Sequence, residues 1–386
     1  MSRQLLIARA DTIVVKVGSS VLTDQYGLDL GRVGRLADQI ARLMAKGKKV
    51  VLVSSGAVAS GVSKAALGRP PRSMPEKQAC AALGQSSLMQ AYEQAFARHA
   101  IKVAQVLLTA DGLNKRSRFL NARNTLTTLL EWGMVPVINE NDTVVVDEIK
   151  LGDNDNLAAV ITNLLAAQLL INLTNVDGLL EEDPRVNPEA KVINRVEKTD
   201  ETMLATASSS PNQVGRGGIL SKIKAAEKAA RCGAHTIVAN GMRDNVLDRL
   251  AAGEELGTLF TPHDTLNRRK HWIAFTARAQ GAVHVDEGAV RPLTEKGRSL
   301  LAAGIRRVEG QFEEGDAVRV LGPGEVVLGV GLVNYGADDV KRIMGLKSAQ
   351  IEATLGHKDY DEVIHRDNLV IFGLEEEESL ACLLNA

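Results

Sequence analysis

Polar and charged side chains gather at four points of the chain, each directly after a short apolar run. The first run ends in Lys16 and a Gly-Ser-Ser turn, and later runs end in Ser54-Ser55-Gly56, in residues 139–142 and in residues 174–178. A single Ser or Asn at a strand end is ordinary turn chemistry. Four such ends, with lysine, amide and carboxylate groups, instead predict a ligand site at the carboxyl edge of a sheet.

Two glycine-containing turns indicate that the ligand carries phosphate. Ser55-Gly56-Ala57 and residues 215–218 each precede a helical pattern, and glycine lets backbone N–H groups approach an anion closely. The second turn is not a Walker A sequence, and no G-x-G-x-x-G follows a strand, so a Rossmann dinucleotide site is not expected. Lys16 and Lys222 are the candidate cations. A lysine in a buried run, such as Lys16, is costly unless it has a partner.

Residues 152–156, Gly-Asp-Asn-Asp-Asn, form a second concentration of polar groups. A helix N-cap explains one such residue but not four in succession. A calcium loop is excluded by the length of the segment and by the missing distal glutamate. The segment therefore adds Asn154 and Asp155 to the candidate site.

Alternating apolar runs and amphipathic stretches predict the elements that position these groups. Six runs are short, apolar and without polar alternation, which is typical of strands buried on both faces: 12–17, 49–53, 102–108, 134–138, 168–173 and 235–239. Helical patterns lie between them, at 32–45, 77–99, 119–131, 156–165 and 219–232. We therefore predict an α/β fold with a mostly parallel sheet sandwiched by helices.

The pattern changes beyond residue 260. Residues 261–280 have the character of an exposed connector, and five short β-like runs follow at 282–285, 317–321, 326–332, 363–365 and 369–372, with a short helix at 337–346. We predict a catalytic domain over 1–260, a linker over 261–280, a small β-rich domain over 281–372 and an acidic tail over 373–386.

Composition argues against several classes of function. The 386 residues include 46 Lys and Arg against 47 Asp and Glu, so the chain has no global attraction for nucleic acid or anionic lipid. No apolar run approaches the roughly 18 residues of a membrane span, and the N-terminus lacks the apolar core of a signal peptide. Three scattered cysteines, Cys80, Cys232 and Cys382, predict neither a disulfide framework nor a structural zinc site. We expect a cytoplasmic protein.

Seven segments, in order along the chain, carry a family resemblance. They are VVKVGSSVLT (14–23), VSSGAVASG (53–61), LGQSSLMQ (83–90), FLNARNTL (119–126), VPVINENDTV (135–144), LGDNDNLAA (151–159) and GRGGILSKIKAA (215–226). These segments resemble the glutamate 5-kinases, a branch of the amino-acid kinase family. EGQFEEGDAVRV (309–320) and GLVNYGADDVKRIMG (331–345) resemble the PUA domain that many bacterial members carry. The resemblance implies ATP-dependent phosphorylation of the γ-carboxylate of L-glutamate, the first step of proline biosynthesis.

The resemblance also implies a role for each polar cluster. Lys16 and Lys222 would be the two lysines that neutralise the transferring phosphoryl group. Asp155 would be the carboxylate that orients them. The residues that hold glutamate would be Ser55, Asn154 and Asp142, the last facing its ammonium group. The ATP site would be lined by Lys16, Thr174, Asn175, Arg216, Gly217, Gly218, Ile219, Leu220, Ser221 and Lys222. Asn175 and Arg216 depart from the family pattern, which often has Asp and Thr at these places.

This chemistry suits the residues. A glutamate side chain has a pKa of about 4.3, so it is already ionised at neutral pH and needs no general base. The site must instead supply positive charge, because the carboxylate and the triphosphate repel each other. The cofactors implied are ATP and Mg²⁺, with the metal held largely by phosphates and water and no protein ligand assigned.

Three alternatives stay open. The first is another family member, such as an acetylglutamate or uridylate kinase, although the INENDTV and GDNDNLAA segments favour glutamate. The second is an RNA-binding protein acting through the PUA-like part, against which residues 281–372 carry 11 Lys and Arg and 15 Asp and Glu, a net charge of −4. The third is a proline sensor without catalysis, against which Lys16, Asp155 and Lys222 are all in place.

The resemblance implies further partners. Proline is expected as a feedback inhibitor that competes with glutamate, because it shares the α-carboxylate and ammonium group. A homo-oligomer is expected, and glutamyl phosphate reductase is a possible partner protein. No membrane contact is expected.

Overall fold

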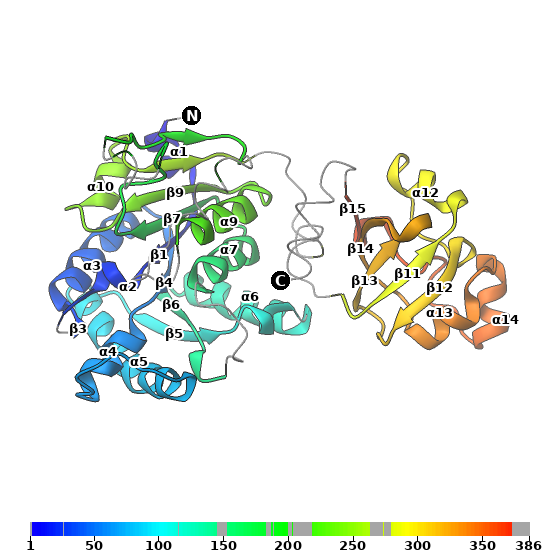
Figure 1. Ribbon diagram of the computed structural model, residues 1–386, viewed down its shortest axis with the longest axis horizontal. Coiled ribbons are helices and arrows are strands. Elements are labelled where there is room, and N and C mark those ends of the chain that lie inside the picture. Colours follow the sequence, from blue (N-terminus) through cyan, green and yellow to red (C-terminus); the bar gives the residue numbers. More distant parts are fainter. Residues whose placement is uncertain are drawn as a thin grey trace. The chain divides into compact units, whose positions relative to one another are not determined.

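The structure, a computed structural model, describes residues 2–25, 27–114, 116–144, 153–182, 187, 189–199, 203, 218–262, 273 and 279–372. The chain divides into two compact units, Met1–Gly112 with Phe119–Leu266, and Leu113–Arg118 with Asn267–Ala386 (Figure 1). Most of the predicted linker and all of the predicted acidic tail lie outside the described residues, so the predicted domain boundaries stay predictions.

An eight-stranded sheet forms the centre of the first unit, in the order β5-β6-β4-β1-β7-β9-β10-β8. Its six long strands are β5 (Val103–Leu108), β6 (Val135–Glu140), β4 (Lys49–Ser54), β1 (Thr12–Val17), β7 (Leu169–Thr174) and β9 (His235–Asn240). All six run parallel, and each lies within two residues of a predicted strand. The sequence missed β10 (Thr258–Phe260), which is antiparallel to β9, and the two-residue strand β8 (Arg195–Val196).

Helices cover both faces of this sheet. The five predicted helices are confirmed as α3 (Leu30–Ala45), α5 (Met74–Ala97), α6 (Arg116–Glu131), α7 (Asp153–Leu165) and α9 (Ile219–Ala230). The other elements among the described residues are α1 (Arg3–Arg9), α2 (Ser19–Leu22), α4 (Ala57–Lys64), α10 (Val246–Ala251), the hairpin β2 (Thr23–Asp24) and β3 (Gly27–Leu28), and the 3-10 turns η1 (Asp111–Asn114) and η2 (Asp142–Val144). None of the described helices is long and apolar enough to cross a membrane.

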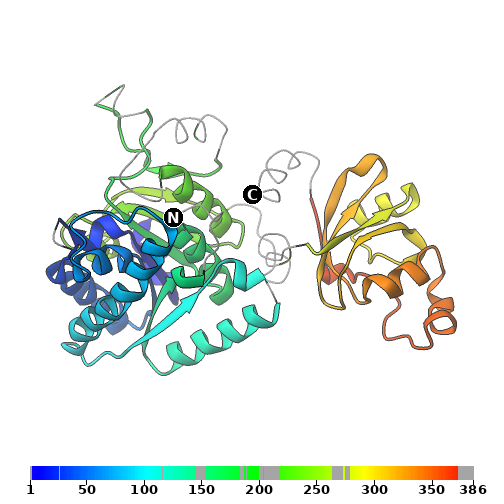
Figure 2. The same ribbon diagram turned by 60° about the horizontal axis from the view of Figure 1, so that its bottom comes forward.

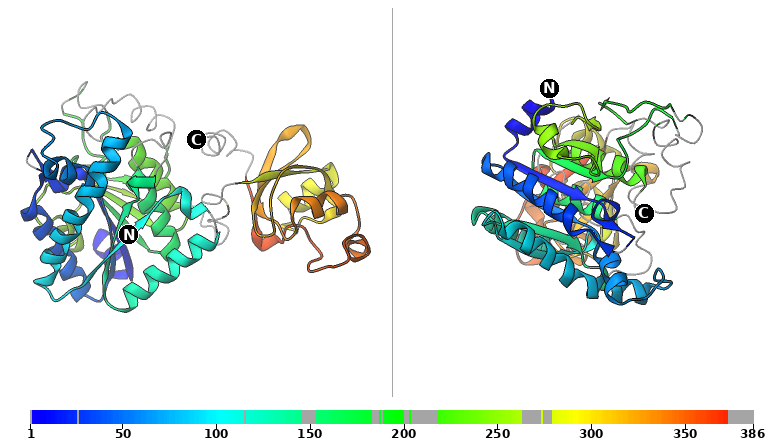
Figure 3. Two further views of the ribbon diagram at one scale, coloured as in Figure 1. Left: turned by 90° about the horizontal axis from the view of Figure 1, so that it is seen from below. Right: turned by 90° about the vertical axis from the view of Figure 1, so that its left-hand side faces the viewer.

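The two faces of the sheet pack against different helices. Successive residues of a strand point to opposite faces. Ile13, Val15 and Val17 of β1 belong to the larger core, together with residues of α1, α3, α5 and α10. Helices α7 and α9 lie over the other face (Figures 1 and 3). Lys16 therefore points toward α7 and α9.

The crossing of α4 and α5 holds the chain that follows β4. A Cβ on Gly84 of α5 would lie 1.9 Å from the carbonyl oxygen of Ala57, and one on Gly61 of α4 would lie 1.8 Å from that of Cys80. Only glycine permits backbones this close. The first turn of α4, directly after Ser55 and Gly56, is therefore fixed against α5.

The second unit contains a five-stranded sheet in the order β12-β11-β13-β14-β15 (Figure 2). The strands are β11 (Gly281–Val285), β12 (Ile305–Gly310), β13 (Ala317–Leu321), β14 (Val327–Leu332) and β15 (Leu369–Ile371), and only β11 and β13 pair in parallel. The unit also has α12 (Glu287–Thr294), α13 (Ala337–Ile343), α14 (Ile351–Leu355) and the 3-10 turns η3 (Ala302–Gly304), η4 (Pro323–Glu325), η5 (Ser348–Gln350) and η6 (Arg366–Asn368).

The predicted strand at 363–365 is wrong. Only Ile364 makes a bridge, to Leu300, and its side chain is fully buried in the core of this unit. Burial of a short apolar run without a ladder explains why it resembles a strand. The other four predicted runs and the helix at 337–346 correspond to β11, β13, β14, β15 and α13.

Candidate active site

Lys16 lies in β1 at the centre of the sheet and is only 5% exposed. Its ammonium Nζ is 2.6 Å from Oδ1 of Asp155, which lies in the first turn of α7. The partner that a buried lysine needs is therefore the carboxylate of Asp155, which is itself buried.

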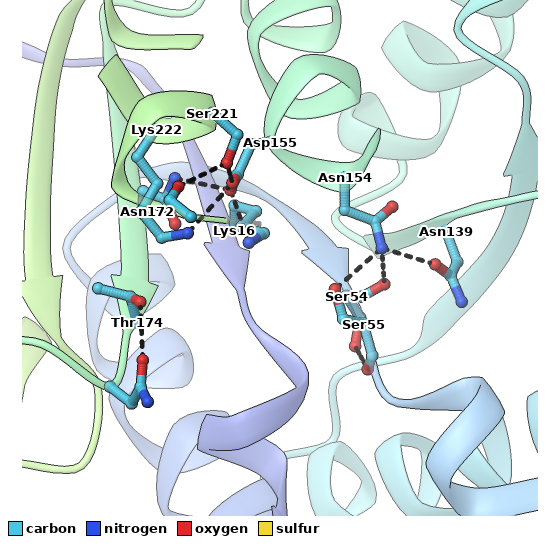
Figure 4. Close-up of polar contacts among 12 residues, drawn as sticks. Lys16, Ser54, Ser55, Asn139, Asn154, Asp155, Asn172, Thr174, Ser221 and Lys222 are labelled. Atoms are coloured by element: carbon cyan, nitrogen blue, oxygen red, sulfur yellow. Dashed lines mark hydrogen bonds and ion pairs between the residues drawn. The ribbon is translucent and has the colours of Figure 1, made fainter. Parts of the chain in front are cut away.

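Asp155 joins two further donors from the start of α9. Its Oδ2 accepts from the Ser221 hydroxyl at 2.7 Å and from Lys222 Nζ at 3.2 Å (Figure 4). Asn172 of β7 donates from Nδ2 to Oδ1 at 2.9 Å. We call Lys16, Asn172, Asp155, Ser221 and Lys222 the lysine–carboxylate cluster. Two ammonium groups share one carboxylate, so the cluster carries an excess of one positive charge.

Burial and pairing oppose each other in this cluster. Burial by itself would raise the pKa of Asp155, but attraction to Lys16 and Lys222, with hydrogen bonds from Lys16 and Ser221, holds that pKa well below its usual range. Burial lowers the pKa of Lys222, and attraction to Asp155 offsets only part of that effect. Asp155 is therefore an anion at neutral pH, and Lys222 holds its proton less tightly than an exposed lysine does.

A second polar group surrounds Asn154, the residue before Asp155. Asn154 Nδ2 lies 2.9 Å from Ser55 Oγ and 3.1 Å from Asn139 Oδ1, and Asn154 Oδ1 accepts from the Glu140 N–H at 3.3 Å. Asn139 in turn donates to Gln85 Oε1 at 2.9 Å. We call these five residues the amide group. It links the carboxyl ends of β4 and β6 to α5 and α7.

The first turn of α7 connects the two groups. Asn154 and Asp155 are consecutive, and Figure 4 shows Asn154 directed toward Ser54, Ser55 and Asn139 while Asp155 is directed toward the lysines. One side of the site thus presents positive charge, and the other presents amide and hydroxyl groups. An anionic group that reacts beside a set of hydrogen-bond donors and acceptors would match this division.

Three helices near these groups begin with glycine. Gly18, Gly56 and Gly218 are the N-caps of α2, α4 and α9, and glycine has no side chain that could cap the first N–H groups. By contrast, Asp29 caps α3 and Ser73 caps α5 with their side chains. Backbone N–H groups at such helix starts are donors that an anion can use.

The remaining predicted site residues belong to neither the lysine–carboxylate cluster nor the amide group. Thr174 ends β7, is buried, and its hydroxyl lies 3.4 Å from Asn175 Oδ1, while Asn175 itself is exposed. Asp142 is half-buried and opens η2, which packs against α5. Ile219 and Leu220 are half-buried in the first turn of α9. Arg216 and Gly217 lie outside the described residues.

Sequence reasoning did not assign roles to Asn172, Asn139 or Gln85. All three are buried polar residues with a partner in the site. Asn172 carried the clearest signal, because an amide inside an apolar strand needs a hydrogen bond as much as Lys16 needs a charge.

The mostly parallel sheet, with two lysines buried beside one carboxylate, defines the class of protein. The chain belongs to the amino acid kinase family, whose family model matches residues 11–240. A model of the PUA domain matches residues 281–355. The predicted family, fold class and PUA domain are thereby confirmed.

Curated relatives share about half of their residues with this chain. The glutamate 5-kinase of Pelobacter propionicus is 49% identical over 371 residues, which are 96% of this chain and 100% of that protein. The glutamate 5-kinase of Geobacter sulfurreducens is 50% identical over 371 residues, with the same coverage of 96% and 100%. That of Syntrophus aciditrophicus is 48% identical over 96% of each chain.

Proposed function

We propose that this chain is a kinase that transfers the γ-phosphoryl group of ATP to the γ-carboxylate of L-glutamate and so forms glutamyl 5-phosphate, the first step of proline biosynthesis. The observation that carries the proposal is the buried cluster in which Lys16 and Lys222 share Asp155. Similarity to proteins named glutamate 5-kinase over 96% of the chain supports the choice of acceptor.

The reaction needs charge rather than a base. An oxygen of the γ-carboxylate forms a bond to the γ-phosphorus, and the bond from that phosphorus to the oxygen that leaves with ADP breaks. No proton has to leave the nucleophile, because a free glutamate side chain is ionised at neutral pH. Lys16 and Lys222 would offset the negative charge of the transferring group, and Asp155 would hold both ammonium groups in position.

Substrate binding follows the division between the two groups. Ser55 and Asn154 of the amide group would hold glutamate together with Asp142. Asp142, which follows Glu140 of that group by two residues, would pair with the ammonium group of glutamate. Thr174, Asn175 and the start of α9 would contact ATP. A substrate held this way has its reactive carboxylate aligned with the phosphate, which removes part of the entropic barrier.

Mg²⁺ would accompany the nucleotide and supply further positive charge. Among the described residues, no cluster of three or more His, Cys, Asp or Glu side chains could hold a metal ion. We propose that phosphate oxygens and water hold most of the coordination positions of the metal, which is the usual preference of Mg²⁺.

We make four further proposals, on the partners, the location and the assembly of the chain. Proline would compete with glutamate, because it offers the same α-carboxylate and ammonium group but no nucleophile. The chain would act in the cytoplasm as a homo-oligomer. Glutamyl phosphate reductase would be the protein that receives the product.

A comparison of acceptors tests the proposed function. We expect glutamate-dependent release of ADP in a coupled assay with Mg²⁺ and ATP. N-acetylglutamate and uridine monophosphate should give kcat/KM values lower by about 10²-fold or more. The acetyl group removes the ammonium charge, and uridine monophosphate lacks the α-carboxylate and ammonium group by which glutamate would be held. Faster turnover of either compound would reassign the chain to another branch of the family.

A further inference from the structure

Asn172 is a buried amide in the middle of the central sheet. It lies in β7, is 1% exposed, and pairs in register with Lys16 of the neighbouring strand β1. Ile171 and Leu173, on either side of it, belong to the larger core on the opposite face. Asn172 therefore points to the same face as Lys16, toward α7.

The amide completes the set of donors around Asp155. Oδ1 of Asp155 accepts from Lys16 at 2.6 Å and from Asn172 at 2.9 Å, while Oδ2 accepts from Ser221 at 2.7 Å and Lys222 at 3.2 Å. Each carboxylate oxygen thus has two donors: those of Oδ1 come from β1 and β7, and those of Oδ2 both come from α9. A carboxylate held by donors on both oxygens cannot rotate without losing several of them.

The orientation of the amide is determined by charge. Asp155 is an anion, so the alternative orientation would place the amide oxygen against a carboxylate oxygen and be repelled. With Nδ2 toward Asp155, Asn172 Oδ1 is buried and has no hydrogen-bond partner among the described residues. A buried acceptor in this state is unfavourable for folding. The amide at this position is therefore better explained by a role in the site than by a contribution to the stability of the core.

We propose that Asn172 is a positioning residue of the phosphoryl-transfer site, acting through Asp155. Its neutral N–H fixes the plane of the carboxylate, and the carboxylate then fixes Lys16 and Lys222. Because the donor carries no charge, it orients Asp155 without using up the excess positive charge that the transferring group needs. This inference rests on the proposed function.

Two variants separate positioning from packing. Asn172→Leu removes the donor at similar volume, and we expect kcat to fall about 10-fold with the KM values for glutamate and ATP changed less than about twofold. Asn172→Asp keeps the size but adds a carboxylate facing Asp155, Lys16 and Lys222. It should lower kcat by about 10²-fold at pH 8, because the excess positive charge is cancelled.

The pH dependence of Asn172→Asp gives a signature that packing does not. The charged groups that face the new carboxyl are Asp155 from α7, Lys16 from β1 and Lys222 from α9. Repulsion from Asp155 raises the pKa of the new carboxyl, and the lysines oppose that rise. Once protonated, the carboxyl is a neutral O–H donor, as the amide was. The ratio of its kcat to the wild-type kcat should therefore rise by at least about threefold from pH 8 to pH 6, whereas the ratio for Asn172→Leu should stay constant.

The measurement is steady-state formation of glutamyl hydroxamate with hydroxylamine, for wild type and variants in parallel, with melting temperatures as a folding check. Asn163→Leu is the matched control, because Asn163 is also buried but lies eight residues along α7 from Asp155, or about 12 Å. It should leave kcat within about twofold of wild type.

The outcomes are distinct. Lack of product with wild type would overturn the proposed function itself. If wild type forms product, two results would overturn only the role of Asn172. The first is a near-normal kcat in Asn172→Leu. The second is a higher kcat in Asn172→Asp than in Asn172→Leu at pH 8. If Asn172→Asp does not fold, the kcat and KM values of Asn172→Leu decide alone.

Discussion

Replacing Lys222 with methionine is expected to lower kcat by about 10³-fold while the KM for glutamate changes only a few-fold. The ammonium group is 3.2 Å from Asp155, and the side chain is 6% exposed. Methionine fills similar space without the charge, so substrate binding is largely kept. What is lost is attraction to negative charge that develops as the phosphoryl group moves, and such attraction acts on kcat.

Lys224→Met is the control for this variant. Lys224 lies two residues further along the same helix, α9, but its side chain is exposed. It should have kcat within about twofold of wild type, since exposed charges contribute little. Comparable kcat values for the two variants would remove Lys222 from the catalytic residues.

Asp155→Asn is expected to reduce both stability and activity. The substitution keeps the shape but leaves Lys16 and Lys222 buried without a counter-charge. Removing one partner of a buried ion pair costs about 3–5 kcal/mol of unfolding free energy. Because the lysines also lose their fixed positions, kcat should fall by about 10²-fold or more. Urea unfolding monitored by circular dichroism measures the stability.

The pH dependence of this loss has a definite sign. The pKa of Asp155 is depressed in the folded protein, so its stabilising effect is complete above the unfolded value of about 3.9 and is lost only at strongly acid pH. At pH 7 the full deficit of Asp155→Asn should therefore be present. Burial lowers the pKa of Lys222, so the deficit should shrink at alkaline pH as Lys222 loses its positive charge.

Asp248→Asn provides the comparison for an exposed pair. Asp248 lies 2.6 Å from Arg42, but the two side chains are 29% and 49% exposed. The expected cost is below about 1 kcal/mol and should not depend on pH between 7 and 10. Equal losses for Asp155→Asn and Asp248→Asn would contradict the account of a buried, charge-coupled cluster.

The sheet of the first unit could be predicted because its strands are buried on both faces. Such strands read as unbroken apolar runs, and the polar residues that follow them mark the carboxyl edge. The strands β10 and β8 have only three and two residues, which is too short for any periodic pattern. In the second unit, β12 was missed because residues 305–310, Ile-Arg-Arg-Val-Glu-Gly, are mostly exposed and charged at an edge of the sheet.

The candidate site could be predicted in its residue types but not in its pairing. The sequence pattern singled out Lys16, Asp155 and Lys222. Their shared role in phosphoryl transfer was inferred only from the family resemblance. Their contact depends on α7 and α9 lying over the same face of the sheet, which no local pattern reveals. Asn172 went unnoticed because a single amide inside residues 168–173 hardly changes the apolar character of the run.

The central claim is that a glutamate γ-carboxylate oxygen attacks the γ-phosphorus of ATP. It can be tested with glutamate carrying ¹⁸O in both γ-carboxylate oxygens, with Mg²⁺, ATP and hydroxylamine. Hydroxylamine attacks the acyl carbon, so the phosphate leaves with the oxygen that had joined carbon to phosphorus. The account predicts one ¹⁸O in each phosphate and one in each glutamyl hydroxamate, both in amounts equal to ADP. Phosphate without ¹⁸O, formed while ADP accumulates, would show that water or another acceptor attacks ATP and would contradict the account.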